Sequence, residues 1–255
     1  MKGEVEYISE GGIFHGSIPH VMGTRLELLA VGVGHEKMKG LWDILYDKVF
    51  DLDRKLNRFD PASEVSYLNT YDNPLEQEKS GVLNEVVTLA HTYYSRTGGL
   101  FDVTDKDGKL DFGGFGKGYF LMLCNRILRD GGVDCAFVDF GSSSILGIGR
   151  HPYGESWRVG LVNPYTRMSI KEISLYDMAM STSGNTPAYS GHIRNPFTDE
   201  VYEGRKLVNV VAEDPLDAEV LSTVLMIAGD KEKEALRKEF PAAAWEEFDL
   251  NEPYM

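Results

Sequence analysis

The chain has 255 residues, of which 42% are hydrophobic and 26% charged, and its formal net charge is −14 at pH 7. This length and composition predict a folded protein with a sizeable core, and the charge argues against a nucleic-acid partner or an anionic membrane surface. We expect a single domain over residues 1–255, no membrane insertion and, with no export signal or lipid anchor visible, a cytoplasmic location. The oligomeric state stays open.

The N-terminal part predicts a mixture of strands and helices. Apolar side chains alternate with polar ones over residues 24–33, as in a strand, and recur at three- and four-residue steps over residues 36–56, as in an amphipathic helix. Asn84 is the candidate N-cap of a second helix. In chain order we expect a strand or hairpin, a strand, a helix, a loop and a helix at residues 4–18, 24–33, 36–56, 58–66 and 84–96.

Strands dominate the C-terminal part. A helix at residues 118–130 precedes them, and two helices at residues 218–228 and 231–239 follow. Because strands and helices do not alternate regularly, the pattern predicts an α+β fold rather than a βαβ series. We interpret Cys124 and Cys135 as reduced packing residues. The expected strands cover residues 135–140, 144–148, 157–161, 168–174, 179–183 and 207–212.

A glycine-rich stretch at residues 110–119 is the strongest local signal. It holds four glycines within residues 113–118 and runs directly into the expected helix at residues 118–130. Glycine allows close backbone approach, a helix N-terminus favours phosphate, and Lys117 adds a full positive charge. The spacing fits neither a Walker A loop nor a dinucleotide-binding fingerprint. A turn that only packs a helix on a sheet is an equally good reading of this stretch alone.

Three further stretches carry chemical groups. The hydroxyls of residues 181–184 can donate to phosphate oxygens, although a simple Ser/Thr-rich turn explains them equally well. His192 lies in a polar loop and can act as a general base, although a lone histidine is more often structural. Glu219 and Thr223 share a helix face and suit Mg²⁺, unless Glu219 only complements the helix dipole and Thr223 only packs.

Taken together, these segments resemble the ApbE family, the FAD:protein FMN transferases. The resemblance covers about residues 20–230, and its motifs occur in family order. The hallmark is Asp-Phe-Gly-Gly-Phe-Gly-Lys-Gly-Tyr at residues 111–119, which matches the family pattern Asp-x-Gly-Gly-x-x-Lys-Gly-Tyr. The other matching segments are residues 22–24, 59–69, 99–104, 157–160, 181–184, 192–196 and 218–223.

The resemblance implies a T-fold-like ApbE architecture, with mixed or antiparallel sheets and packed helices. It also implies a reaction in which FAD is the substrate, FMN is transferred to a threonine hydroxyl of a partner flavoprotein, AMP is released and Mg²⁺ assists. His192 corresponds to the catalytic base. The positions that correspond to FAD contacts are Met22, Phe59, Asp111, Lys117, Ser181, Thr182, Ser183 and Ile193. Those that correspond to the metal site are the Gly114 carbonyl, Glu219, Ser222 and Thr223.

The chain departs from the family pattern at three places. Glu219 stands where the metal carboxylate is usually Asp, and Asp199 stands where the histidine segment usually ends in Gly. Only residues 105–110 separate the Phe-Asp-x-Thr motif from the glycine hallmark, where many members carry a longer segment that helps to enclose the flavin. These departures leave two alternatives, an FAD-binding or FAD-hydrolysing paralogue without transferase activity and a non-catalytic interaction protein.

Overall fold

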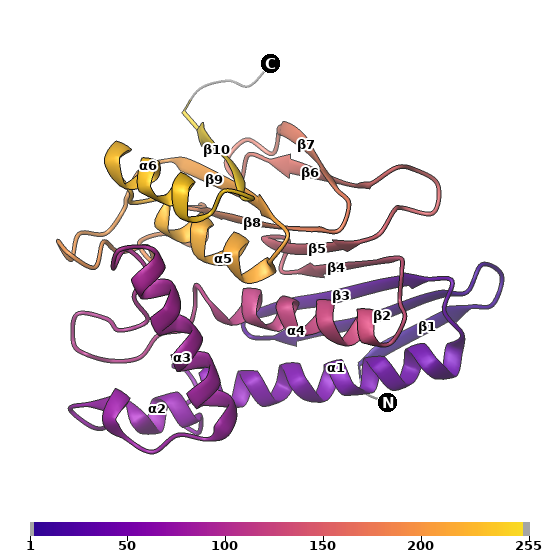
Figure 1. The fold of residues 1–255 in the computed structure, drawn as a ribbon, viewed down its shortest axis with the longest axis horizontal. Helices are drawn as coiled ribbons and strands as arrows, with labels where there is room; N and C mark the ends of the chain where they lie inside the picture. Colours follow the sequence, from indigo (N-terminus) through magenta and orange to yellow (C-terminus); the bar gives the residue numbers. More distant parts are fainter. Residues whose placement is uncertain (1–2, 252–255) are drawn as a thin grey trace.

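The structure is a computed structural model that describes residues 3–251. Within this range, eight strands form one sheet in the order β1-β2-β3-β4-β5-β8-β9-β10, and every neighbouring pair is antiparallel (Figure 1). The expected α+β class is therefore confirmed. The strands of the sheet are β1 (Glu4–Ile8), β2 (Ile13–Val21), β3 (Thr24–Val31), β4 (Ala136–Phe140), β5 (Ser144–Ile148), β8 (Met178–Gly184), β9 (Lys206–Ala212) and β10 (Ala244–Asp249).

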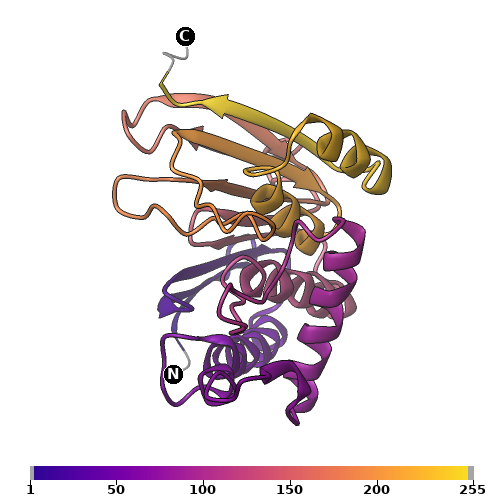
Figure 2. The same cartoon turned by 90° about the vertical axis from the view of Figure 1, so that its left-hand side faces the viewer.

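Helices cover one face of this sheet. The helices α1 (His35–Leu56), α4 (Gly116–Asp130) and α5 (Pro215–Val224) lie along that face, and Figure 2 shows them almost end on. The helix α3 (Gly81–Arg96) crosses them steeply, and α6 (Asp230–Glu239) lies near β10. Two short helices, α2 (Glu64–Leu68) and η1 (Pro74–Glu76), connect α1 to α3. This layer brings α4 beside α5, although 84 residues (131–214) separate them in sequence.

The opposite face of the sheet is partly covered by the hairpin of β6 (Trp157–Val162) and β7 (Ser169–Leu175). Alternate residues of a strand point to opposite faces, so neighbouring positions belong to different cores. Leu146 and Ala179 belong to the main core, whereas Ile145 and Met180 pack with Trp157 of the hairpin. Both faces of the central strands are therefore apolar, and β5 is buried along its whole length.

Most expected elements are confirmed, but four boundaries are wrong. The expected loop at residues 58–66 ends early, because Ser63 caps α2 by accepting a hydrogen bond from the Ser66 N–H at 3.0 Å. The N-cap of α3 is Ser80 and not Asn84, because the Ser80 hydroxyl accepts from the Leu83 N–H and its own N–H is held by Glu64. The helices expected at residues 118–130 and 218–228 both begin earlier in the structure.

Two features were not anticipated from the sequence. The strand β10 pairs with β9 at the edge of the sheet, where only part of its side chains are covered. Trp42 is buried on α1 between the apolar positions that the periodicity identified. The two cysteines, Cys124 and Cys135, are free thiols, as expected.

Over residues 3–251, no helix combines the length and the apolar character that a bilayer crossing requires. Residues 1–2, which belong to the N-terminal stretch considered for an export signal, lie outside the described residues, as do residues 252–255 of the expected domain. The cytoplasmic location stays a prediction.

Candidate functional site

The glycine-rich stretch forms the turn that leads into α4. The side chain of Asp111 folds back over this turn and accepts a hydrogen bond from the Gly113 N–H at 2.8 Å. Its other oxygen accepts from Arg58 at 2.8 Å, and Arg58 also donates to Asp105 at 3.0 Å. Burial alone would raise the pKa of Asp105, but the backbone N–H groups of Lys109 and Asp107 and the Arg58 guanidinium together lower it. The turn before α4 is therefore fixed by a cation held between two carboxylates.

In the first turn of α4, Lys117 reaches the buried carboxylate of Glu219 on α5, with 2.7 Å between Nζ and Oε1. The same ammonium donates to the Ser144 hydroxyl at 2.8 Å and to the Ser143 hydroxyl at 3.3 Å. The other carboxylate oxygen, Oε2, accepts from Ser144 at 2.6 Å and from Ser181 at 2.8 Å. Four elements, α4, β5, β8 and α5, thus meet at one carboxylate.

Strand register brings the two serines together, since Ser144 of β5 lies opposite Ser181 of β8. A chain of hydroxyls then continues outward, because Ser222 of α5 is 3.0 Å from Ser181 and 2.9 Å from Ser183. Burial alone would raise the pKa of Glu219, but the charge of Lys117 and the donated hydrogen bonds lower it. Glu219 is therefore an anion inside the protein, and its charge is balanced by Lys117.

Three close approaches depend on glycine. A Cβ at Gly118 would lie 2.5 Å from the Glu219 Cβ, and a Cβ at Gly116 would lie 2.5 Å from the Met22 Cε. At Gly114 the nearest atom is the Thr223 Oγ1, at 3.3 Å from the position of a Cβ. Met22 itself has a positive φ of 49° in the two-residue turn between β2 and β3, which directs its side chain onto the start of α4.

His192 lies in the loop between β8 and β9, next to the buried Ile193. His192 is exposed, and its imidazole stacks on Tyr189, with 4.1 Å between the ring centroids. Partial burial lowers the pKa of His192, the charge of Lys117 lowers it further, and the charge of Asp111 opposes both. The ring is therefore neutral at pH 7 and can accept a proton. Its electrostatic partners are the two charged residues of the glycine-rich stretch.

Two residues of the predicted set lie apart from this cluster. Thr182 alternates with Ser181 and Ser183 along β8, and its hydroxyl faces the other side of the sheet, where it accepts from Asn209 at 3.0 Å. The Thr182 hydroxyl therefore faces away from the cluster, and the predicted FAD contact of this residue stays a prediction. Phe59 is 83% exposed and touches the site only through Arg58, whose guanidinium lies 5.9 Å from the Phe59 ring centroid.

The residues predicted to hold Mg²⁺ do not form an open metal site. Both oxygens of Glu219 accept hydrogen bonds from Lys117 and two serines, and the Ser222 and Thr223 hydroxyls lie 2.9 and 3.3 Å from the Glu219 main-chain carbonyl, to which they donate. Mg²⁺ prefers oxygen ligands in near-octahedral geometry, which this arrangement does not offer at the carboxylate. Over residues 3–251, no group of three or more His, Cys, Asp or Glu side chains could hold a metal ion.

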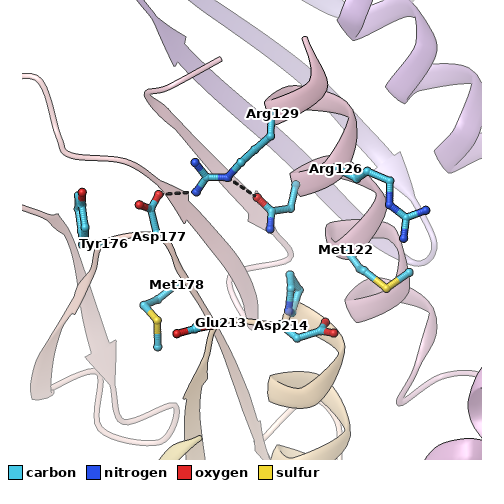
Figure 3. Close-up of a pocket in the computed structure, with 10 residues that line it drawn as sticks. Met122, Arg126, Arg129, Tyr176, Asp177, Met178, Glu213 and Asp214 are labelled. Atoms are coloured by element: carbon cyan, nitrogen blue, oxygen red, sulfur yellow. Dashed lines mark hydrogen bonds and ion pairs between the residues drawn. The ribbon is translucent and has the colours of Figure 1, made fainter. Parts of the chain in front are cut away.

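A separate open hollow lies at the C-terminal end of α4 (Figure 3). Its lining includes Arg126, the Arg129–Asp177 ion pair and Tyr176, together with Asp214 at the start of α5. None of the predicted site residues lines it. The predicted site residues therefore lie away from this hollow, around the glycine-rich stretch at the opposite end of α4.

Several residues of the site were missed in the sequence. Ser143 and Ser144 follow Gly141 in a run of three serines, which is a donor-rich signal of the same kind as residues 181–184. Arg58 and Asp105 carry no local signal, because their pairing joins segments 47 residues apart. Tyr189, which stacks on His192, lies three residues before it and could have been considered as its support.

Comparisons with family models and with solved structures give matches. The model of the ApbE family matches residues 104–245. Among solved structures, the apo flavinyl transferase ApbE of Pseudomonas stutzeri is 22% identical, with a TM-score of 0.75 over 92% of this chain and 90% of that one. The flavin transferase ApbE of Vibrio cholerae is 19% identical, with a TM-score of 0.75 and coverage of 96% and 97%. The ApbE protein of Thermotoga maritima is 19% identical, with a TM-score of 0.72 and coverage of 91% and 93%. The comparison with curated proteins finds no match.

Proposed function

Because the chain belongs to the ApbE family, we propose that it is a flavin transferase that moves FMN from FAD to a threonine hydroxyl of a partner flavoprotein and releases AMP. The observation that carries the proposal is the convergence of α4's N-terminus, Lys117, the serines of β8 and the His192 loop. Two solved structures of similar fold are named as flavin or flavinyl transferases, which supports the same reaction class.

The proposed step is an in-line substitution at phosphorus. The threonine oxygen of the acceptor attacks the phosphorus of the FMN half of FAD, and the bond between that phosphorus and the bridging oxygen breaks. AMP leaves with the bridging oxygen, and the threonine proton passes to a ring nitrogen of His192. A hydroxyl is a weak nucleophile at neutral pH, so a neutral imidazole is the group that this step requires. The lowered pKa of His192 supports this role.

The diphosphate of FAD needs donors and positive charge while the bond breaks. The start of α4 supplies backbone N–H groups and the positive end of a helix dipole. Lys117 supplies an ammonium, and the hydroxyl of Ser183 lies at the outer end of the serine chain. The resemblance also implies Mg²⁺. Because the hydrogen bonds of Glu219 leave its carboxylate unsuited to be a metal ligand, the proposed step does not use a metal ion.

The test is flavin transfer to a candidate acceptor. Incubation with FAD and the acceptor is expected to yield an acceptor band that is fluorescent because it carries covalently bound FMN, and an equal amount of AMP. His192→Ala should abolish both products, whereas His20→Ala, which changes an exposed histidine on β2, should leave them unchanged. Absence of both products over a panel of flavoprotein acceptors would reject the proposal.

One observation favours hydrolysis without transfer as a second candidate. Thr104 and Leu110 form a β-bridge that closes the short segment between them, so this chain has no long insertion there to cover the flavin. Water then has access to FAD. If FAD is cleaved to FMN and AMP at the same rate by the wild type and by His192→Ala, and no acceptor is labelled, this candidate replaces transfer. If FAD leaves the melting temperature unchanged, a non-catalytic interaction protein becomes the better interpretation.

A further inference from the structure

The side chain of Glu219 is 4% exposed and has three donors within 2.8 Å, namely Lys117, Ser144 and Ser181. A buried carboxylate is costly unless charge and hydrogen bonds compensate it, and breaking a buried pair leaves an uncompensated charge. Because Oε2 already accepts from two serines, a divalent ion would have to share Oε1 with the ammonium of Lys117, whose positive charge repels it. The arrangement therefore holds the carboxylate on the ammonium.

The contacts of Lys117 are unequal. An ammonium has three N–H donors, and here they reach Glu219 at 2.7 Å, Ser144 at 2.8 Å and Ser143 at 3.3 Å. Glu219 and Ser144 are buried, whereas Ser143 is partly exposed. The contact with Ser143 is therefore the longest and the one that a ligand reaches from outside. A phosphate oxygen can replace it without disturbing the buried pair.

The position of Lys117 in α4 determines where a phosphate that replaces the Ser143 contact would lie. The residue lies in the first turn of α4, so its ammonium adds to the positive end of the dipole of that helix. Its charge also acts on His192. An anion held at Lys117 is thus near the imidazole that accepts the proton in the proposed reaction.

We propose that the ammonium of Lys117, and not a metal ion, neutralises the Glu219 carboxylate, and that this chain binds the diphosphate of FAD without a divalent ion at Glu219. The inference rests on the proposed function for its ligand, but the assignment of the cation rests on the contacts alone. It predicts that Mg²⁺ is not needed for FAD binding.

The first measurement is FAD affinity, read by flavin fluorescence, in EDTA and in Mg²⁺. The dissociation constants are expected to agree within about threefold, since no metal is lost from the site. Lys117→Gln is expected to weaken FAD binding by about tenfold or more in both conditions, whereas Lys231→Gln, an exposed lysine on α6, should change nothing. Binding that requires Mg²⁺, or an unchanged affinity in folded Lys117→Gln, overturns the inference.

The second measurement uses Mn²⁺ alone and does not depend on FAD. The electron paramagnetic resonance signal of free Mn²⁺ should not fall by a stoichiometric amount when the protein is added. A stoichiometric Mn²⁺ site that disappears in Glu219→Gln overturns the inference, even if Lys117→Gln fails to fold. FAD binding that appears only with Mg²⁺ would contradict this inference but would leave the transferase proposal intact. If FAD binds in neither condition, the transferase proposal fails and the Mn²⁺ result still decides the cation assignment.

Discussion

Replacing Gly118 by alanine tests the closest contact between α4 and α5. The new Cβ would lie 2.5 Å from the Glu219 Cβ, 3.0 Å from its Cγ and 3.2 Å from the Pro215 carbonyl oxygen. Two of these atoms are a Cβ and a main-chain oxygen, which cannot rotate away, so the helices must separate. Overpacking of this kind costs about 1–3 kcal/mol, and the geometry puts Gly118→Ala in the upper half of that range.

Alanine also gains about 0.5–1 kcal/mol over glycine within a helix. The net loss of unfolding free energy is therefore about 1–2.5 kcal/mol, which corresponds to a melting temperature lower by about 2–10 °C for a domain of this size. Urea denaturation should show a lower midpoint with an unchanged slope, because the surface exposed on unfolding is the same.

The matched control is Gly40→Ala on α1, where a Cβ would meet nothing within 4 Å. That variant keeps the helix-propensity gain without the clash, and it is expected to be more stable than wild type by about 0.5–1 kcal/mol. If Gly118→Ala melted at or above the wild-type temperature while Gly40→Ala behaved as expected, the close approach of the two helices would be wrong.

Three further predictions use other parts of the structure. Because burial and the charge of Lys117 lower the pKa of His192, the titration midpoint of its ring in an NMR experiment should lie below 6.5, and transfer activity should be half lost at that midpoint and fall further at lower pH. A midpoint at or above 6.5 contradicts this. Tyr93→Phe removes a hydrogen bond of 2.6 Å to the Asp217 carboxylate and should cost about 1.5–3 kcal/mol in urea denaturation, and an unchanged midpoint would show that the bond contributes nothing. Ser63→Ala removes the N-cap bond to the Ser66 N–H and should cost about 1 kcal/mol, whereas a Ser63→Asp variant that keeps an acceptor should stay close to wild type.

Periodicity predicted the long elements because their burial is one-sided. The stripe of residues 36–56 is the buried face of α1, and the C-terminal strands are bounded by turn residues that the sequence displays. The strand β10 was not predicted, because only part of its side chains are covered at the sheet edge and the alternation of apolar and polar residues is therefore weak. The N-cap of α3 was not predicted, because Ser80 is held in place by Glu64. This contact joins residues 16 positions apart, which local sequence patterns do not reveal.

The site residues also divide into those that the sequence could identify and those that depend on contacts between distant segments. The motif positions of the resemblance identified Lys117, Ser181 and Glu219, and the structure joins them. The sequence could not show that Lys117 and Glu219 pair with each other, because 102 residues separate them. It also could not bring in Ser144, which reaches the carboxylate only because β5 and β8 pair in the register that sets it opposite Ser181.

The two readings of the glycine-rich stretch, a phosphate loop and a packing turn, are not exclusive. Gly116 and Gly118 are needed for protein contacts, since a Cβ at either would collide with Met22 or Glu219. At Gly113, by contrast, a Cβ would meet only the side chain of Asp111, at 3.1 Å. Gly118 therefore lets α4 approach α5 closely enough for Lys117 to reach a buried carboxylate, whereas Gly113 leaves space in the turn before the helix. In the proposed function, the first half of the motif binds phosphate, while its second half brings Lys117 to the Glu219 carboxylate.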